Sequence, residues 1–274
     1  MLCGTRAIAL TAVGLLCLGS LGAAAASDPA THRSEHFFAV EVSDDELLLV
    51  DKLTGTAKPV ATVAAPIIAG LAYDHDAVLI YAIDASSRYL WTIDPAQGWE
   101  MDSVGNTGIV DPLAAAIDPS SGNLYVLGTD QDQAPATALY LVDKSTAAAV
   151  GLGLTGFDYL SALDFDPVTG VLYAARGGYY DTGVLLTLNP MSGAATEVAS
   201  TRRFSAISFD ESGILYGIDN TPAFSALYTI DKSTGACSLV GYLWVDNVMC
   251  AVFDSTIPTP VQGKSWGRIK ALFR

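Results

Sequence analysis

Residues 206–235 read AISFDESGILYGIDNTPAFSALYTIDKSTG, and two phrases within them, AISFDESGILY and LYTIDKSTG, recur along the chain. The first phrase also occurs as GLAYDHDAVLIY from Gly70, AAAIDPSSGNLY from Ala114, ALDFDPVTGVLY from Ala162 and a shortened CAVFD from Cys250. The second occurs as LLLVDKLTG from Leu47, LWTIDPAQG from Leu90, LYLVDKST from Leu139 and LLTLNPMSG from Leu185. The chain therefore contains five copies of one structural unit.

The spacing of these copies indicates the architecture. The anchoring residues of the second phrase are 43, 49, 46 and 42 residues apart: Asp51, Asp94, Asp143, Asn189 and Asp231. A period of roughly 40 to 50 residues is typical of propellers and solenoids. Each copy holds four short β-rich runs separated by turn residues, with little helical periodicity between Phe37 and Asp254. We predict an all-β, five-bladed β-propeller built from four-stranded antiparallel blades.

The two ends of the repeat region are complementary. Phe37 to Ser43 matches the second strand of a blade, and Met249 to Asp254 matches an innermost strand that no second strand follows. We therefore expect one mixed blade, in which the C-terminal strand pairs with the N-terminal ones. Such a closure removes the free sheet edges that invite aggregation.

The turns that follow the first and third strands of a blade share one composition. They read DPSSG at Asp118, DPVTG at Asp166 and DKSTG at Asp231. The Asp side chain accepts backbone hydrogen bonds two residues on, and Gly supplies a positive φ. We define the end of the ring that carries these turns as the turn face and the opposite end, with its variable connections, as the loop face. Turn-face side chains are expected to bond to their own backbone, so Lys232→Ala should leave ligand binding unchanged.

The repeated phrases Leu-Tyr-x-x-Asp and x-Ile-Asp-x-x-Thr-Gly resemble those of the YVTN-like and NHL-like β-propeller repeat superfamily. The resemblance covers nearly all of residues 37–254 and implies the fold alone. Members of these groups include enzymes, sensors and adhesive surface modules, so the resemblance does not select an activity.

Regions outside the repeats divide the chain further. Residues 1–26 have an early Arg6, an apolar run and a small-residue end, the layout of a secretory signal peptide. We expect a secreted or cell-surface bacterial protein with a lead-in at 27–36, the propeller at 37–254, and no membrane span after signal cleavage. Residues 255–274 form a Pro-containing linker and a basic amphipathic tail. That tail is either a surface-attachment or sorting segment, or a segment that is disordered or docked on the propeller.

Charge and cysteine content exclude several functions. All 29 acidic residues lie between Asp28 and Asp254 with only nine basic ones, a net charge of −20 for that segment. Nucleic acid is excluded as a partner, because binding phosphates needs a basic surface. Cys237 and Cys250 are assigned to an outermost and an innermost strand, roughly 14 Å apart at about 4.8 Å per strand, too far for a disulfide. No metal or cofactor is expected.

Candidate ligand-binding residues gather in the loop-face connections, where variable loops on a constant scaffold usually carry function. Aromatic faces with a few directional polar groups suit sugars or peptide side chains. The predicted set is Asp158, Tyr159, Asp164, Arg176, Tyr179, Tyr180, Arg202, Arg203, Trp244 and Asp246. The alternative interpretation is that Tyr179 and Tyr180 merely cover a loop.

Asp164 is the one carboxylate among the corresponding inner-strand positions Ala72, Ala116, Ser208 and Val252. Because burying an unpaired charge is costly, we expect it to face the channel, to pair with Arg176 or Arg202, or to have a raised pKa.

No catalytic residues are predicted, because the sequence offers no nucleophile and base at a recognisable spacing. We therefore favour a non-enzymatic binding or surface-interaction module for a glycan or protein ligand. The alternative is a secreted, glycosidase-like hydrolase or lyase that uses carboxylates at the channel mouth, with Asp111, Asp158, Asp164 and Asp246 as the plausible suppliers.

Overall fold

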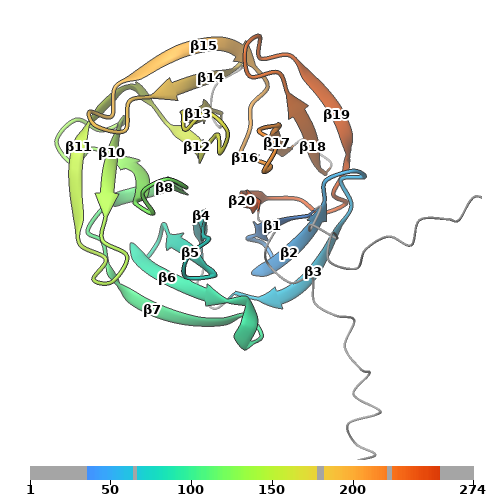
Figure 1. The fold of residues 1–274 in the computed structure, drawn as a ribbon, viewed down its shortest axis with the longest axis horizontal. Helices are drawn as coiled ribbons and strands as arrows, with labels where there is room; N and C mark the ends of the chain where they lie inside the picture. The colour runs from blue at the N-terminus through green and yellow to red at the C-terminus, as the bar shows by residue number, and fades with distance from the viewer. Residues whose placement is uncertain (1–35, 64–66, 178–181, 221–223, 254–274) are drawn as a thin grey trace, which may run out of the picture. The chain divides into compact units, whose positions relative to one another are not determined.

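The computed structural model describes residues 36–63, 67–177, 182–220 and 224–253. They form five antiparallel four-stranded sheets arranged as blades around a central axis (Figure 1). The predicted five-bladed β-propeller is confirmed.

Each blade contributes one strand to each of four concentric layers (Figure 1). The inner strands are β20 (Val248–Phe253), β4 (Ile68–Asp74), β8 (Val110–Ile117), β12 (Leu160–Phe165) and β16 (Ala206–Phe209). The second strands are β1 (His36–Glu41), β5 (Leu79–Asp84), β9 (Leu124–Thr129), β13 (Leu172–Arg176) and β17 (Leu215–Asn220). The third strands are β2 (Glu46–Asp51), β6 (Tyr89–Asp94), β10 (Ala136–Val142), β14 (Gly183–Leu188) and β18 (Ser225–Ile230). The outer strands are β3 (Ala57–Thr62), β7 (Glu100–Asn106), β11 (Ala149–Asp158), β15 (Ala195–Thr201) and β19 (Cys237–Tyr242).

We number the blades one to five from the blade that contains β1. That blade joins the two ends of the repeat region in the order β20-β1-β2-β3. Strand β20 pairs antiparallel with β1, and Phe37 lies opposite Phe253 and Ala39 opposite Ala251. The predicted mixed blade is confirmed, with strand limits that differ from the expected ones by one or two residues. Ring closure therefore depends on hydrogen bonds between strands more than 200 residues apart in sequence.

Blades pack on one another through small residues. In every blade the pairing of the third and outer strands shifts register at the same point, which leaves a β-bulge at Val60, Val104, Leu152, Val198 and Val240. The residue after each bulge is Gly or Ala: Ala61, Gly105, Gly153, Ala199 and Gly241. A Cβ atom on Gly241 would lie 1.9 Å from the Thr54 carbonyl oxygen of the next blade. The small residue therefore allows the next blade to approach.

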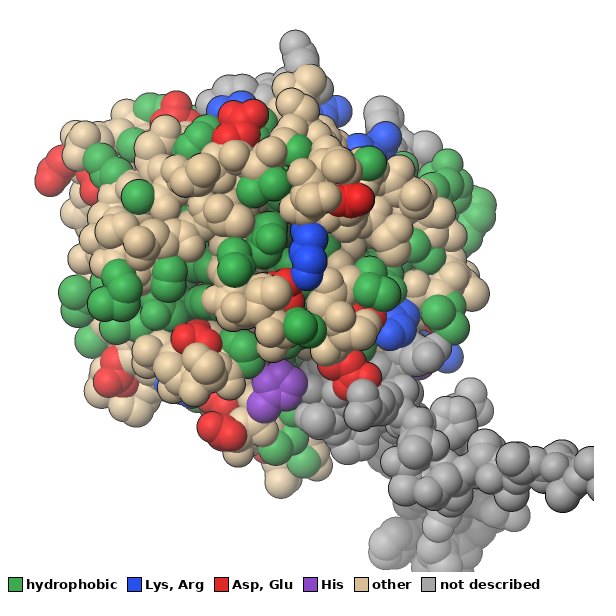
Figure 2. Space-filling view, turned by 45° about the horizontal axis from the view of Figure 1, so that its top comes forward, with side chains coloured by type: hydrophobic (Ala, Val, Ile, Leu, Met, Phe, Trp, Pro, Cys, Tyr) green, Lys and Arg blue, Asp and Glu red, His purple; other side chains and the backbone are tan. Residues whose placement is uncertain are grey.

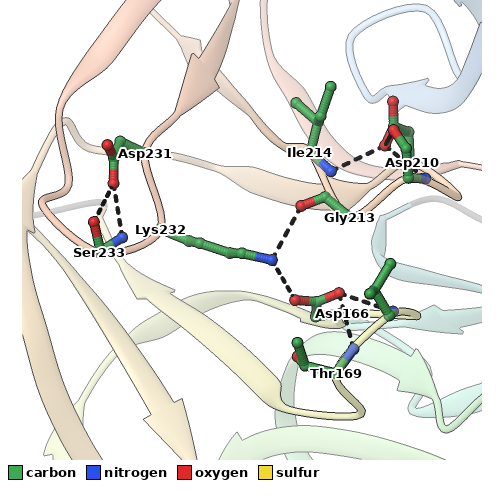
Figure 3. A network of polar contacts seen from close by, with 10 residues as sticks. Asp166, Thr169, Asp210, Gly213, Ile214, Asp231, Lys232 and Ser233 are labelled. Carbon is green, nitrogen blue, oxygen red and sulfur yellow. Dashed lines mark hydrogen bonds and ion pairs between the residues drawn. The ribbon is translucent and has the colours of Figure 1, made fainter.

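The turn face follows the predicted chemistry and adds contacts between blades. One carboxylate oxygen of Asp166 accepts bonds from the Val168 and Thr169 amides of its own turn, at 2.9 and 3.4 Å. The other oxygen binds Lys232 of the next blade, whose Nζ also donates to the Gly213 carbonyl oxygen (Figure 3). The expectation that turn-face side chains serve only their own backbone was therefore wrong. Asp74–Lys144 and Asp210–Lys52 repeat the arrangement between two other pairs of neighbouring blades.

The exceptions to this pairing are consistent with the turn sequences. Where blade four has Pro190 in place of the lysine, the second oxygen of Asp118 in blade three accepts a bond from Ser121 Oγ instead, at 2.8 Å. Blade two carries Pro95 at this position, and its turn forms the short 3₁₀ helix η2 (Pro95–Gln97) capped by Asp94. Lysine in the third-strand turn thus accompanies each of the three cross-blade ion pairs.

The two cysteines lie in the strands to which the sequence assigned them, and both thiols are free. Cys237 starts outer strand β19, and Cys250 is buried in inner strand β20. Within the described ranges, no helix is long and apolar enough to cross a membrane.

Candidate functional site

The central channel opens into a recess at the loop face. This recess has a volume of about 420 Å³. Its floor is formed by one residue near the start of each inner strand: Ala69, Leu113, Ser161, Ser205 and Met249. Below the floor the channel narrows to about 10 Å³ between small inner-strand residues. The channel is therefore wider at its loop-face end than at mid-depth.

Five equivalent positions surround this mouth, one from each blade. Each lies seven residues before the aspartate that ends the first phrase of its repeat, and they are Ile67, Asp111, Tyr159, Arg203 and Asn247. Their equivalence is visible in the backbone, because the carbonyls of Ile67 and Asn247 accept matching bonds from Ala85 and Val42. All five residues are exposed. We call them the rim residues: the scaffold presents an apolar, an acidic, an aromatic, a basic and an amide side chain at the same place in five blades.

Three rim residues have a backbone conformation that side chains rarely adopt. The φ angles of Asp111, Tyr159 and Asn247 are 40°, 53° and 51°. Residues other than glycine at positive φ cost on the order of 1 kcal/mol or more and gather at functional sites. The conformation also fixes the direction in which each side chain leaves the rim.

The polar groups of the floor are already bonded to neighbouring blades. Ser161 Oγ donates to the Phe204 carbonyl oxygen at 2.8 Å, and Ser205 Oγ donates to that of Val248 at 2.7 Å. Asn220, another lining residue, donates from Nδ2 to the same Val248 oxygen at 2.9 Å. These bonds hold the blades together under the recess and give it a fixed shape.

An ion pair between buried Asp219 and exposed Arg202 lies at one wall of the recess. Asp219 lines it and accepts two bonds on Oδ2 from Arg202, at 3.0 Å from Nε and 2.6 Å from Nη2. The Arg202 guanidinium lies 4.4 Å from the centre of the Tyr228 ring, a cation–π contact. The predicted residue Arg202 therefore orients a wall of the recess, while its neighbour Arg203 lines the recess itself.

Asp164 lies near the opposite end of the channel. It lines a cavity of about 120 Å³ at the turn face, away from the other predicted site residues. Its Oδ2 accepts bonds from Ser208 Oγ at 2.9 Å and the Phe209 amide at 2.8 Å, and Ser208 Oγ in turn accepts from the Phe253 amide.

This small network decides between the expectations for Asp164. Pairing with Arg176 or Arg202 was wrong, because the Asp164 carboxylate instead accepts bonds from Ser208 and Phe209 at the neighbouring inner strand β16 and from the amide of Phe165 in its own strand. The residue is partly exposed to the cavity, but its carboxylate is enclosed by protein. Burial raises the pKa of Asp164 to about 6, against the hydrogen bonds from Phe209 and Ser208 that lower it. The network links the inner strands of blades four, five and one, so Asp164 has a structural role at ring closure.

The other predicted residues are dispersed over the loop face. Arg176 stacks over the Phe157 ring at 5.7 Å, and Asp158 ends the outer strand β11. Trp244 and Asp246 are exposed in the loop that leads into β20, outside the recess lining. Tyr179 and Tyr180 lie outside the described residues. Of the eight predicted residues that the structure describes, Arg203 alone lines the recess.

Several lining residues were missed, although the sequence contained a signal for them. Ser161, Ser205 and Met249 are found by counting back five residues from the phrase-ending aspartates, and the rim residues by counting back seven. Asp219 is the aspartate of a Leu-Tyr-x-x-Asp phrase and was treated as a repeated fold residue. Asp111 was considered only as a possible carboxylate for catalysis.

One face of the molecule shows scattered charges of both signs (Figure 2). On the face in view in Figure 2, basic side chains occur singly among acidic and hydrophobic ones, and no extended basic area is visible. Among the described residues, no three His, Cys, Asp or Glu side chains are grouped so that they could hold a metal ion.

These features define the protein as a five-bladed β-propeller with a narrow central channel and a recess at its loop face. The sequence matches no protein-family model and no curated protein. A chain from the crystal structure of a nidogen–laminin complex has the same fold, with 16% identity and a TM-score of 0.56 over 79% of this chain and 97% of that one. The PQQ-bound aldose sugar dehydrogenase of Streptomyces coelicolor aligns with 18% identity and a TM-score of 0.49, over 64% of this chain and 62% of that one. At these identities the likeness shows the β-propeller fold alone.

Proposed function

We propose that this protein is an exported, non-enzymatic binding module that holds a glycan or protein ligand on its loop face, with the recess as the anchoring site. One observation carries the proposal: five equivalent, exposed rim positions present five different side-chain chemistries at the loop face, and two of them, Asp111 and Arg203, line a preformed recess. A residue needed only for folding would tend to recur from blade to blade, as the turn aspartates and the Gly or Ala after each bulge do. Variation confined to one mouth of a regular scaffold is typical of recognition.

The size and composition of the recess support this role. Small-molecule sites usually occupy about 300 to 1,000 Å³ and combine an apolar lining with a few placed polar groups. Here the floor is largely apolar, and Asp111 and Arg203 bring opposite charges to the mouth. A ligand segment the size of a few sugar or amino-acid residues would fit and could be oriented by the two charges.

The alternative is a glycosidase-like hydrolase, and one observation favours it. Two carboxylates, Asp111 and Asp219, line the recess, and glycoside hydrolysis uses two carboxylates about 5 to 9.5 Å apart. However, one oxygen of Asp219 accepts two bonds from Arg202, which favours a structural role for this carboxylate. A broad glycosidase screen tests this function. If the protein hydrolyses a glycan at this site, Asp111→Asn should abolish the activity.

Export rests on the signal-like residues 1–26, and surface attachment through the basic tail remains a proposal of the same kind. Mass spectrometry of protein recovered from outside the expressing cells tests the first: cleavage near residue 26 supports it, and an intact N-terminus in the cytoplasm contradicts it. Comparison of surface retention for the full chain and a chain ending at residue 254 tests the second.

The binding proposal is tested with purified residues 27–274 on arrays of glycans and of proteins. For a ligand held in the recess, Asp111→Ala and Arg203→Ala should each weaken binding by about 1 to 3 kcal/mol, as anchors of an interface do. Asp76→Ala and Lys58→Ala replace exposed charged residues away from the loop face and should leave binding unchanged. Loss of binding in the control pair but not in the rim pair would show that the recess is not the site.

A further inference from the structure

A cluster of exposed aromatic side chains lies on blade five, outside the recess. The Trp244 ring centre is 5.3 Å from that of Phe224 and 5.8 Å from that of Tyr242. The exposed fractions are 65% for Trp244, 43% for Tyr242 and 40% for Phe224. We call these three residues the aromatic ledge; a single exposed aromatic needs no explanation, but three exposed rings that meet at Trp244 form a patch.

The backbone at Trp244 indicates that this residue is retained for its side chain. Its φ is 61°, a left-handed conformation that favours glycine. The equivalent positions in blades two and three are Gly108 and Gly156, with φ of 72° and 83°. The equivalence follows from matching bonds: the Thr107 amide donates to the Arg88 carbonyl oxygen, and the Leu243 amide to that of Ser225. Two other blades use glycine at this position, so a large exposed Trp carries a cost in strain and in exposed apolar area without an evident folding benefit.

The arrangement of the three rings favours some classes of ligand over others. A cage for an organic cation needs rings that stand apart, because the cation sits within about 6 Å of each ring centre. The ledge rings instead touch each other, tilted by 59° and 47°. They form a stepped apolar surface on which a flat ligand can lie, as the C–H face of a pyranose does on aromatic rings.

The polar groups beside the ledge fit sugar hydroxyls. The same loop carries Asp246 and Asn247, both exposed, and Asn247 Nδ2 lies 2.9 Å from Ser43 Oγ. Residues 242–248 (YLWVDNV) contain this one carboxylate and no basic residue. A carboxylate and an amide accept and donate bonds to hydroxyls, whereas the absence of lysine and arginine from this loop disfavours an anionic glycan.

We infer that the aromatic ledge of Phe224, Tyr242 and Trp244 is a binding site for a neutral glycan. The exposed area of the three rings, on the order of 300 Å² from typical aromatic side-chain areas, matches a short saccharide. A stable protein interface buries about 800 Å² on each partner, which favours the glycan over a protein on this patch. None of the three ledge residues lines the recess, so the ledge is a separate site from the recess of the proposed function; Asn247, which flanks the ledge, is also a rim residue.

The test uses purified residues 27–274 on one array that carries both neutral and anionic glycans. Wild-type protein should retain neutral glycans, and Trp244→Gly should weaken that retention at least tenfold. Glycine is the matched replacement, because Gly108 and Gly156 show that the scaffold accepts it; the thermal unfolding midpoint should therefore be unchanged or raised. Tyr89→Ala removes another exposed aromatic, in blade two, and should retain wild-type binding.

Each other outcome overturns the inference. The inference is overturned if the wild-type protein retains only anionic glycans or retains no glycan. It is also overturned if wild type and Trp244→Gly bind neutral glycans with equal affinity. A protein ligand lost in Trp244→Gly while the glycans stay unbound would make the ledge a protein contact. The same array also measures Asp111→Ala and Arg203→Ala. These two variants test the recess proposal, whereas Trp244→Gly tests the ledge inference, so one can be contradicted without the other.

Discussion

Lys232 Nζ in the third-strand turn of blade five lies 2.5 Å from Asp166 Oδ2 in the first-strand turn of blade four (Figure 3). The Asp166 side chain is fully buried, and that of Lys232 is 35% exposed. Lys232 thus neutralises the carboxylate of Asp166, which the turn that contains Asp166 already shields from water. Because the pair joins two blades, it links the folding of one repeat to that of the next.

Replacing Lys232 by Met should lower the free energy of unfolding by about 1 to 3 kcal/mol. Loss of one partner of a buried ion pair typically costs about 3 to 5 kcal/mol, and the partial exposure of Lys232 reduces this. Urea denaturation of the purified variant measures the change. Lys58→Met, at an exposed position of outer strand β3, is the control and should stay within about 0.5 kcal/mol of wild type. Equal stability of the two variants would mean that the cross-blade pair contributes nothing.

Acid should destabilise the ring through the same aspartates. Burial alone would raise the pKa of Asp74, Asp166 and Asp210, but bonds from the lysines and the turn groups outweigh it, so each pKa is lower than its ordinary value of 3.8. Folding therefore favours the charged form, and this stabilisation is present above about pH 4 and lost as pH falls below it. Denaturation at a series of pH values should show this fall, and a variant with Lys52, Lys144 and Lys232 all replaced by Met should show a smaller one. A wild-type slope in the triple variant would contradict the assignment.

Asp164 should have the opposite effect in a different pH window. Its raised pKa of about 6 means that the folded state holds the proton more tightly than the unfolded one. Stability from this group is therefore greatest below about pH 4 and falls as pH rises to about 6, by about 1 to 3 kcal/mol. Asp164→Asn should remove this fall while the amide keeps the bonds to β16. A variant with the wild-type profile between pH 4 and 7 would show that another group is responsible.

Ring closure should depend on β20. A chain that ends at residue 247 lacks the strand that pairs with β1 and exposes two inner faces, so we expect it to lose cooperative unfolding. A chain that ends at residue 253 keeps all twenty strands and should melt like the full chain. Circular dichroism melts of the two truncations distinguish these results; cooperative folding of the shorter chain would show that the mixed blade is dispensable.

The fold was predictable because one pattern is repeated five times. The phrases around Asp166 and Asp231 specify a turn by local chemistry, and the period then fixes the number of blades. Even the pairing of β1 with β20 followed from the sequence, because two incomplete repeats complement each other.

The site was less predictable because contacts between blades join residues that are far apart in the sequence. Nothing adjacent in sequence joins Asp164 to Ser208, 44 residues away, or Lys232 to Asp166, 66 residues away. Emphasis on unusual residues such as Asp164 also led away from the recess. Alignment of the repeats would have shown more: Asp111 and Arg203 occupy one repeat position, which varies in every blade.

Hydrogen–deuterium exchange of residues 27–274, with and without a ligand retained on the arrays, tests the central claim most directly. Ligand should slow exchange in peptides covering 107–113, 155–161, 201–207 and 245–250, where the rim and floor of the recess lie. Peptides covering the turns at 74–79, 118–123, 166–171 and 210–214 should be unaffected. Protection confined to those turns, with the rim peptides unchanged, would place the binding face at the opposite end of the ring and contradict the account.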